Sequence, residues 1–488
     1  MTRARSLPTL LRPLRVALLL LFACRRGPTP ASEPPAPVVT PEAKPTPAPA
    51  ATPAVQYFMG AIELPGAQLP FFVVVRERDG KPSALLDIPA QAAFGLPLSD
   101  VRADDEAVTF RAAQVGASWR ATLDAEGDPD ECSFSQGGAT LPCSLARVDE
   151  ATWLAARKPK RPQLPQPPLP YATREVAVKS GDVTLAGTLA VPAGAGPHPA
   201  ALLLTGSGAQ DRDETLFDHK PFFVLADHLA RHGIATLRLD DRGVGGSGGD
   251  LGHATLETLV DDAVAAVAWM RTQPELAPAK IGVIGHSEGG LVGPAAAARS
   301  RDVAFVVMLA GPGLPGGDVI VDQLEVIARR SGASEADIAQ ALAQQRQVIA
   351  AVREHADAAA RRAALEPLLA GDAAATAQLE AAVSPWFRSF VVYDPAPTLR
   401  KLRQPVLALL GGLDVQVTAA ANAAPLRKAL AKNRRARVRE FAGLNHLFQH
   451  ASSGLVGEYG TIEETMAPEV LDAIATWIAS DGVGKPAR

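Results

Sequence analysis

The serine with the clearest chemical setting is Ser287, in the stretch KIGVIGHSEGG at residues 280–290. The apolar run before it predicts a buried strand, and the small residues after it continue into a helical pattern. Glycines at positions 285 and 289 would let the chain turn sharply between these elements, so that the hydroxyl projects toward a substrate carbonyl. Gly-x-Ser-x-Gly also arises by chance, so its meaning depends on a base and an acid elsewhere in the chain.

A histidine must take the proton of the serine hydroxyl, and a carboxylate must orient that histidine. After a strand–serine–helix turn, the order along the chain is serine, acid, histidine. His446, in the loop GLNHLF after the strand-like run ARVREF, is the predicted base, and His450 is the second candidate. Asp414 follows the apolar run PVLALLGG and is the predicted acid. Asp394 is the alternative, although no long apolar run precedes it.

Donors for the developing oxyanion are expected from two backbone amides. The residue after the nucleophile, Glu288, supplies one, and the loop LLLTGSGAQ after an earlier strand supplies the other at Ser207. Removing one such donor typically lowers turnover by about 10²–10³. The predicted site is therefore the triad Ser287, Asp414 and His446 with the amides of Ser207 and Glu288.

Apolar runs alternate with helical stretches in the second half of the chain: AALLLTG, IATLRLDD, KIGVIGHS, VAFVVMLAG and PVLALLGG. Continuous apolar strands separated by helices predict a parallel sheet covered on both faces. Residues from about 318 to 395 interrupt this alternation with helices alone. One of these helices begins at Ser334, with Asp337 three residues later. Its apolar face comprises Ile338, Leu342, Val348 and Ile349. We expect this insertion to form a lid over the strand ends, where ligands bind in such folds.

Five motifs taken in order resemble the α/β-hydrolase superfamily: LLLTGSGAQDRDE, IATLRLDDRGVGGSGG, IGHSEGG, LALLGGLDVQV and LNHLFQ. More narrowly, they are similar to bacterial carboxylesterases grouped with the serine aminopeptidase-like hydrolases. The resemblance covers roughly residues 57–478. It implies a small β domain, a hydrolase domain at residues 173–482 with an inserted helical lid, and a triad on Ser287, Asp414 and His446.

The first 24 residues are typical of an export signal. Four arginines precede the apolar residues 16–23, which are too few to span a bilayer. The following LFAC resembles the bacterial lipobox, so we expect Cys24 to be lipidated; an ordinary signal peptide cut elsewhere is the alternative. Residues 25–54 are rich in Pro and Ala and predict an extended linker. The protein is therefore expected in the cell envelope, tethered to a bacterial membrane through its N-terminus.

Residues 55–150 predict a β-rich domain, because apolar runs flank turn signals such as Asp79-Gly80. Cys132 and Cys143 stand on either side of glycines and a proline, where the chain can double back. A disulfide suits an exported protein, two reduced buried thiols are the alternative, and a metal site is the weakest option. A second Pro-rich linker is expected at residues 155–172.

Two further patterns receive structural interpretations. GVGGSG at residues 243–248 matches a dinucleotide-binding pattern, but neither an immediate helix nor a suitably placed acid follows. We therefore expect a structural loop, braced by Asp241 and Arg242 near the site. His228 and His232 have the spacing of metal ligands on a helix, yet the sequence pairs no carboxylate with them, so a solvated helix face is expected.

The charges nearly cancel, with 48 basic and 52 acidic residues, and aromatic residues are scarce. Neither a basic stripe nor a stacking surface for bases is present, so nucleic acid is not an expected partner. We expect a serine hydrolase that cleaves small carboxylic esters through an acyl-enzyme, without a cofactor or metal. An aminopeptidase or an acyl thioesterase would use the same triad, and a catalytically silent lipoprotein is the non-enzyme alternative.

Overall fold

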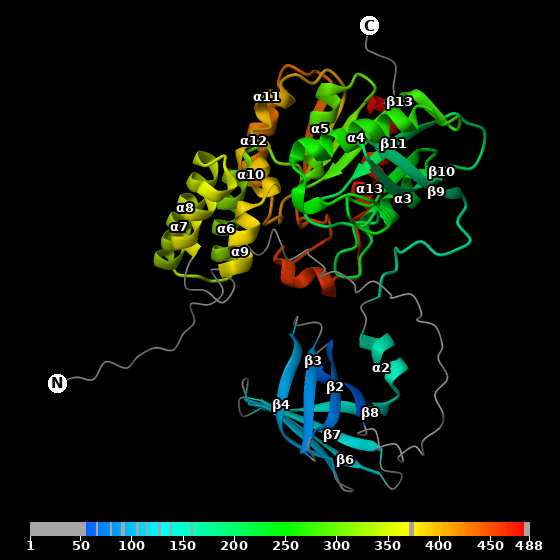
Figure 1. Ribbon diagram of the computed structural model, residues 1–488. Helices are drawn as coiled ribbons and strands as arrows, with labels where there is room; N and C mark the ends of the chain where they lie inside the picture. The colour runs from blue at the N-terminus through cyan, green and yellow to red at the C-terminus, as the bar shows by residue number, and fades with distance from the viewer. Residues whose placement is uncertain are drawn as a thin grey trace, which may run out of the picture. The chain divides into compact units, whose positions relative to one another are not determined.

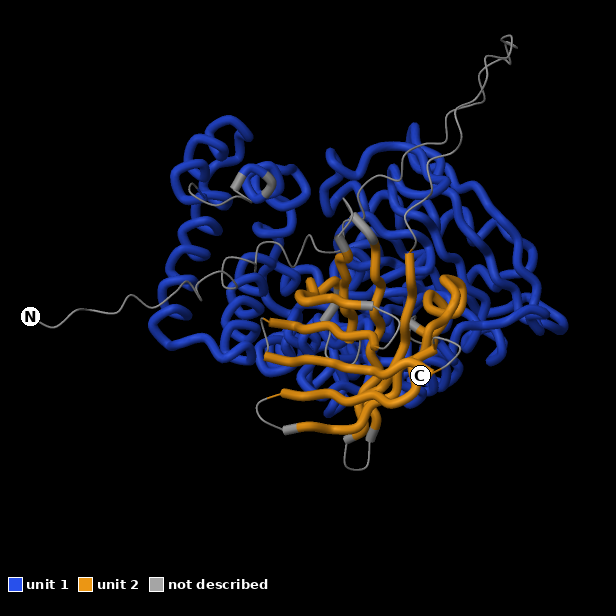
Figure 2. Tube along the Cα trace, turned by 90° about the horizontal axis from the view of Figure 1, so that it is seen from below, with its two compact units in different colours: residues 1–29, 161–488 blue, residues 30–160 orange. Residues whose placement is uncertain are grey.

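The computed structural model describes residues 55–64, 67–78, 81–88, 93–103, 107–113, 116–124, 128–136, 139–157, 160–369 and 375–482. Two compact units divide after residue 160 (Figures 1 and 2). The predicted export signal with Cys24, the first linker and the Asp79-Gly80 turn lie outside the described residues. Within the described ranges, none of the helices combines the length and apolarity that a bilayer crossing needs.

The first unit along the chain, drawn as unit 2 in Figure 2, is a closed antiparallel barrel in which each strand pairs with the next and β8 pairs with β1. Its strands are β1 (Val55–Leu64), β2 (Ala67–Arg78), β3 (Lys81–Ile88), β4 (Ala93–Ala103), β5 (Ala107–Ala112), β6 (Ala117–Leu123), β7 (Pro129–Gln136) and β8 (Ala139–Val148), followed by helix α2 (Glu150–Arg157). Buried aromatic side chains pack together in its core, namely Phe58, Phe71, Phe110, Trp119 and Phe134. Because side chains fill it, the barrel carries its own hydrophobic core.

Cys132 and Cys143 lie directly opposite each other on β7 and β8. Their Cα atoms are 4.9 Å apart and their sulfur atoms form a disulfide. The bridge therefore links two neighbouring strands of the barrel.

The second unit along the chain, drawn as unit 1 in Figure 2, is built on an eight-stranded sheet with the order β16-β15-β14-β13-β11-β12-β10-β9. Its strands are β9 (Ala172–Ser180), β10 (Val183–Val191), β11 (His198–Leu204), β12 (Ala235–Leu239), β13 (Leu276–His286), β14 (Val306–Leu309), β15 (Val406–Gly411) and β16 (Ala436–Phe441). β10 is antiparallel to both of its neighbours, and the pairs from β12 to β16 are parallel. The carboxyl ends of the parallel strands consequently meet at one edge.

Helices cover both faces of this sheet (Figure 1). They are α3 (Pro221–Arg231) and α13 (Pro468–Trp477) on one face, and α4 (Leu256–Met270), α5 (Gly289–Arg299) and α12 (Ala419–Leu430) on the other. Side chains of β11 contribute alternately to the cores on the two faces. Ala200 and Leu202 pack into the core under α4, whereas Ala201 and Leu203 pack into the core under α3. Side chains of a strand point alternately to opposite faces, so an uninterrupted apolar run supplies both cores.

A helical insert separates β14 from β15. It comprises α6 (Gly316–Arg330), α7 (Glu335–Glu354), α8 (Ala358–Leu369), α9 (Ala375–Val383) and α10 (Pro385–Val392), with the short α11 (Ala396–Leu399) leading back to the sheet. α7 begins as its sequence predicts, because the Ser334 hydroxyl accepts a hydrogen bond from the Asp337 amide at 3.2 Å. The predicted fold class is confirmed: a mostly parallel sheet with helices on both faces, an inserted helical block and a preceding β domain.

Short helices complete the second unit, namely η4 (Leu251–His253), η5 (Val456–Thr461) and η6 (Ile478–Gly482).

Candidate active site

Ser287 stands on a sharp turn between β13, which ends at His286, and α5, which begins at Gly289. Its φ angle of 51° is positive, a conformation that costs energy for a residue with a side chain. The Ser287 amide donates a hydrogen bond to the carbonyl of Leu309 at the end of β14, 2.8 Å away. This bond holds the turn, and Ser287 remains partly exposed while its neighbours on both sides are buried.

The glycines at positions 285 and 289 are required by the packing of this turn. A Cβ atom on Gly289 would overlap the backbone carbonyl of Leu204 on β11, and one on Gly285 would overlap the carbonyl of Gly289. Backbone atoms on both sides leave no flexible group that could move aside. The structural reason inferred for the glycines from the sequence is thus confirmed.

His446 and Asp414 form a buried pair at the carboxyl edge of the sheet. His446 Nδ1 lies 2.8 Å from Asp414 Oδ2 and donates to it. The other carboxylate oxygen of Asp414 accepts the amides of Gln416 at 2.7 Å and Val417 at 2.9 Å. Since Nδ1 carries the proton, Nε2 of the neutral imidazole keeps a lone pair that can accept another. This is the pairing expected of an acid that orients a base.

The alternative residues occupy different settings. His450 is exposed and pairs with Glu464 and Glu469, at 3.0 and 3.1 Å. Asp394 is exposed too, and its carboxylate accepts the amide of Ala396 at the start of α11. Neither residue belongs to the buried pair at the end of β15.

His286, next to the nucleophile, connects the elbow to the histidine loop. Its Nε2 donates to the carbonyl oxygen of His446 at 3.0 Å, and the two rings lie 4.7 Å apart between centroids. Its Nδ1 lies 2.8 Å from Glu214 Oε1, and the same oxygen accepts the amide of Gly206 at 2.6 Å. Burial opposes a charge on His286, but the adjacent Glu214 carboxylate prevails and raises the pKa of the imidazole.

Glu214 was missed in the sequence analysis. Its position in the run DRDE gave no signal, because three other charged residues surround it in the sequence. Only the fold shows that Glu214 is 1% exposed and linked to both the elbow and the loop after β11.

The loop after β11 passes directly beside the elbow, as the oxyanion prediction requires. A Cβ atom added to Gly206 would lie 3.3 Å from Ser287 Cβ. The Gly206 amide is bonded to Glu214, and the Ser207 amide is the next one along this loop. Glu288 stands at the N-cap of α5, where the helix dipole favours negative charge.

The Glu288 side chain joins the elbow to the helical insert. Its Oε1 accepts a hydrogen bond of 2.7 Å from the indole Nε1 of Trp386 on α10. The side chain is buried, and burial raises the pKa of its carboxyl from 4.5 to about 7, although the indole donor opposes the change. A carboxyl beside the nucleophile therefore changes its charge near neutral pH.

A cavity of about 100 Å³ opens beside the elbow, between the loop after β11 and the helical insert. Glu288 and Trp386 line it, together with Asp241 at the end of β12. Asp241 accepts hydrogen bonds from the Thr205 hydroxyl at 2.7 Å and the Gln210 amide at 3.0 Å. Burial also raises the pKa of Asp241, so the cavity wall combines apolar surface with two carboxyl groups that resist ionisation.

The GVGGSG segment at residues 243–248 forms a loop that is hydrogen-bonded to Asp240, and no helix begins within it. Asp240 Oδ2 accepts the Gly246 amide at 3.0 Å, and the Ser247 hydroxyl donates to the Asp240 carbonyl. Arg242 forms a double hydrogen bond with Asp262 on α4, which brings that loop against the helix. The loop thus has the structural role expected from the sequence.

Three acidic residues of the helical insert form hydrogen bonds or ion pairs with other residues of the insert. Glu325 and Glu335 both pair with Arg329, and Asp337 accepts from Ser334 at the start of α7. These three carboxylates thus serve helix termini and surface ion pairs.

Residues 220–450 match the family described as Serine aminopeptidase, S33. The chain is also 28% identical to the esterase EstD of Thermotoga maritima over 294 residues, which is 60% of this chain and 65% of that one. The residues matched by the family include the elbow. The chain has the α/β-hydrolase fold. It spans somewhat less than two thirds of the length of the curated relative.

Two solved structures of hydrolases are among those similar to this chain. An esterase of Pyrococcus furiosus is 16% identical with a TM-score of 0.38, over 56% of this chain and 82% of that chain. A dienelactone hydrolase of Anabaena variabilis is 18% identical with a TM-score of 0.35, over 64% and 98% of the two chains.

Proposed function

We propose that this protein cleaves carboxylic esters through an acyl-enzyme formed on Ser287. The observation that carries the proposal is the buried His446–Asp414 pair, 2.8 Å apart, tied through His286 to a strained serine turn. The match to an esterase supports ester substrates. No step of the proposal requires a group from outside the chain except water.

In the acylation step, Ser287 Oγ attacks the carbonyl carbon while His446 Nε2 takes the hydroxyl proton. Asp414 holds the imidazole in the tautomer with Nδ1 protonated and stabilises the cation that forms. The amides of Ser207 and Glu288 donate to the oxyanion of the tetrahedral intermediate. Collapse of this intermediate breaks the ester C–O bond, and the alcohol leaves with the proton from His446.

In the deacylation step, water replaces the alcohol. His446 takes a proton from the water as its oxygen attacks the acyl carbon, and a second tetrahedral intermediate forms. Its collapse returns the proton to Ser287 and releases the carboxylic acid. The same residues serve both steps, so one substitution should abolish both.

Ser287→Ala tests the proposal directly. We expect hydrolysis of short-chain p-nitrophenyl esters to fall by roughly 10⁴-fold or more, with an unchanged circular dichroism spectrum. A fluorophosphonate probe should label the wild type and not the variant. Full esterase activity in Ser287→Ala would refute the proposal, and a wild type that neither turns over esters nor takes the label would favour a silent binding module.

A matched pair of histidine variants tests the base. His446→Ala should abolish activity and labelling, whereas His450→Ala, four residues away and exposed, should retain them. Equal losses in both variants would argue that the loop, and not the imidazole of residue 446, carries the effect.

An aminopeptidase is the second candidate, favoured by the description of the matched family. It requires a carboxylate that binds the substrate amine. Glu325, Glu335 and Asp337 are engaged elsewhere. Of the carboxylates that line the cavity, Asp240 pairs with Arg212 and Asp262 pairs with Arg242, which leaves Glu288 and Asp241. Parallel assays on an ester, an aminoacyl amide and a thioester distinguish the candidates: the ester should be hydrolysed fastest, and faster cleavage of the amide would overturn the esterase proposal.

The N-terminal segment supports a proposed location. A basic stretch, a short apolar stretch and Cys24 fit an exported, lipid-anchored protein of the cell envelope. Labelling with a fatty acid should occur in the wild type and disappear in Cys24→Ser. A wild type without the label would refute the anchor.

A further inference from the structure

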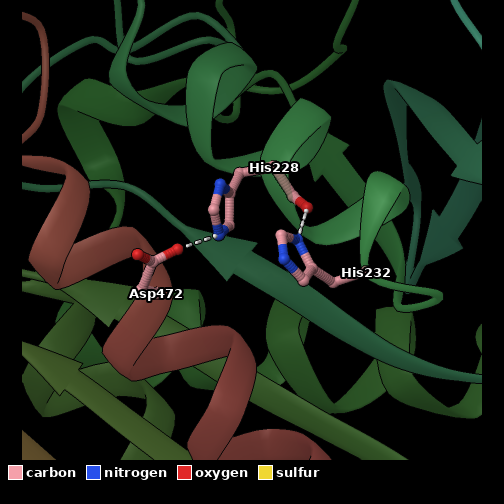
Figure 3. Close-up of side chains that lie close together, drawn as sticks. All are labelled: His228, His232 and Asp472. Carbon is pink, nitrogen blue, oxygen red and sulfur yellow. Dashed lines mark hydrogen bonds and ion pairs between the residues drawn. The ribbon is translucent and has the colours of Figure 1, made fainter.

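Three potential metal-ligating side chains converge on the face of the sheet covered by α3 and α13. His228 and His232 come from α3 and its C-cap, and Asp472 comes from α13 (Figure 3). The expectation of a solvated helix face for the histidines is therefore incomplete. The sequence alone paired no carboxylate with the histidines, because Asp472 lies on α13, far along the chain from α3.

The two imidazoles are arranged so that ring nitrogens remain available. Their centroids lie 4.3 Å apart in a stacked geometry. His232 Nδ1 donates to the backbone carbonyl of His228 at 2.7 Å, which leaves the lone pair of the neutral ring on Nε2. Histidines that bind metals usually donate their other ring N–H to a carbonyl or carboxylate in this way.

The spacing of the other two ligand atoms matches that of groups sharing one ion. The buried His228 Nε2 lies 3.3 Å from Asp472 Oδ1, the contact drawn as a dashed line in Figure 3. Two ligands of a tetrahedral Zn²⁺, each about 2.0–2.1 Å from the ion, stand about 3.4 Å apart. All three ligand atoms lie within 4.8 Å of one another, and the exposed His232 and Asp472 can rotate to close the remainder.

We propose that His228, His232 and Asp472 form a binding site for a single Zn²⁺ ion, with water as the fourth ligand. Two imidazoles and one carboxylate suit zinc, whereas Mg²⁺ and Ca²⁺ prefer all-oxygen sites. Apolar residues of α3 and α13 pack into the same core, so the ligands stand on two rigid elements. The ion cross-links these helices and stabilises the fold; it does not take part in the proposed ester hydrolysis.

Zinc titration of the full chain, stripped of metal with a chelator, tests the site. Isothermal calorimetry should give one Zn²⁺ per chain, and saturating zinc should raise the melting temperature by a few degrees. His232→Ala and Asp472→Asn should each weaken binding at least tenfold and remove the thermal shift. Both residues are exposed, so these variants should fold without metal.

His253→Ala is the matched control. His253 and Asp250 form an exposed pair at 2.7 Å on another part of the surface, and its loss should leave zinc binding unchanged. The proposal is wrong if the wild type binds no more zinc than the variant lacking both His232 and Asp472. It is also wrong if Asp472→Asn binds as tightly as the wild type, because the ion would then rest on α3 alone.

Discussion

The carboxyl of Glu288 should make folding depend on pH, and its neutral isostere should remove that dependence. Its pKa is 4.5 in the unfolded chain and about 7 in the folded one, because the folded side chain is buried beside the elbow. Below pH 4.5 both states hold the proton, so Glu288 contributes nothing. As the pH rises toward 7, the unfolded chain releases a proton that the folded chain retains, and the free energy of unfolding falls.

The two pKa values set the magnitude. At about 1.4 kcal/mol per pH unit, the span from 4.5 to about 7 gives a loss of at most about 3.5 kcal/mol, nearly complete by pH 8. Glu288→Gln keeps an oxygen that can accept from Trp386 Nε1 but cannot ionise. Between pH 5 and pH 8, the stability of Glu288→Gln relative to wild type should therefore rise by about 2.5 kcal/mol.

Guanidinium unfolding curves at pH 5 and pH 8 measure this difference for wild type and Glu288→Gln. Glu366→Gln, at an exposed position on α8, serves as the control and should follow the wild type at both pH values. The protonation of His219 also contributes to the pH dependence of stability, since burial lowers its pKa to about 4. All three proteins contain His219, so its contribution cancels when they are compared. The reasoning fails if Glu288→Gln and wild type differ by the same amount at pH 5 and pH 8.

Three further predictions test the elbow, the acid and the barrel. Gly289→Ala should destabilise the fold by about 1–3 kcal/mol in thermal melts and abolish labelling by the fluorophosphonate, because its Cβ would overlap the backbone of Leu204. Gly457→Ala is the control, since its Cβ would meet open space, and it should change neither the melt nor the labelling. Asp414→Asn should lower kcat for esters by roughly 10³–10⁴, and Asp394→Asn should not; equal rates in the two variants would exclude Asp414 as the orienting acid. Replacing Cys132 and Cys143 with serine opens a loop with a sequence separation of 11 and should destabilise the barrel by about 3 kcal/mol in thermal melts, while ester turnover by the other unit persists.

Local signals in the chain were sufficient for much of the fold. The apolar runs of β11, β13, β14 and β15 identified the sheet, since a strand buried on both faces has no polar positions to alternate. Ser334 marked the start of α7 because its capping contact spans only three residues. The glycines around Ser287 reported the tight turn, since their neighbours are backbone atoms of the adjoining strand and helix.

Other features were decided only by the tertiary structure. Glu214 contacts His286, Trp386 contacts Glu288, and Asp472 contacts His228. The residues of each pair are too far apart in the sequence for a helix or strand period to predict the contact. The chain contains many other charged and aromatic residues, and nothing local distinguishes Glu214, Trp386 or Asp472 from them. Each forms its contact because its segment packs beside the other residue in the folded unit.

The sequence alone thus determined which serine lies on a turn and in what order an acid and a histidine follow it. The fold decided which carboxyls are buried, and burial raises the pKa of Glu288 and opposes charge on His286. The physical reason is that turns and caps depend on neighbours within a few residues, whereas desolvation depends on everything packed around a group.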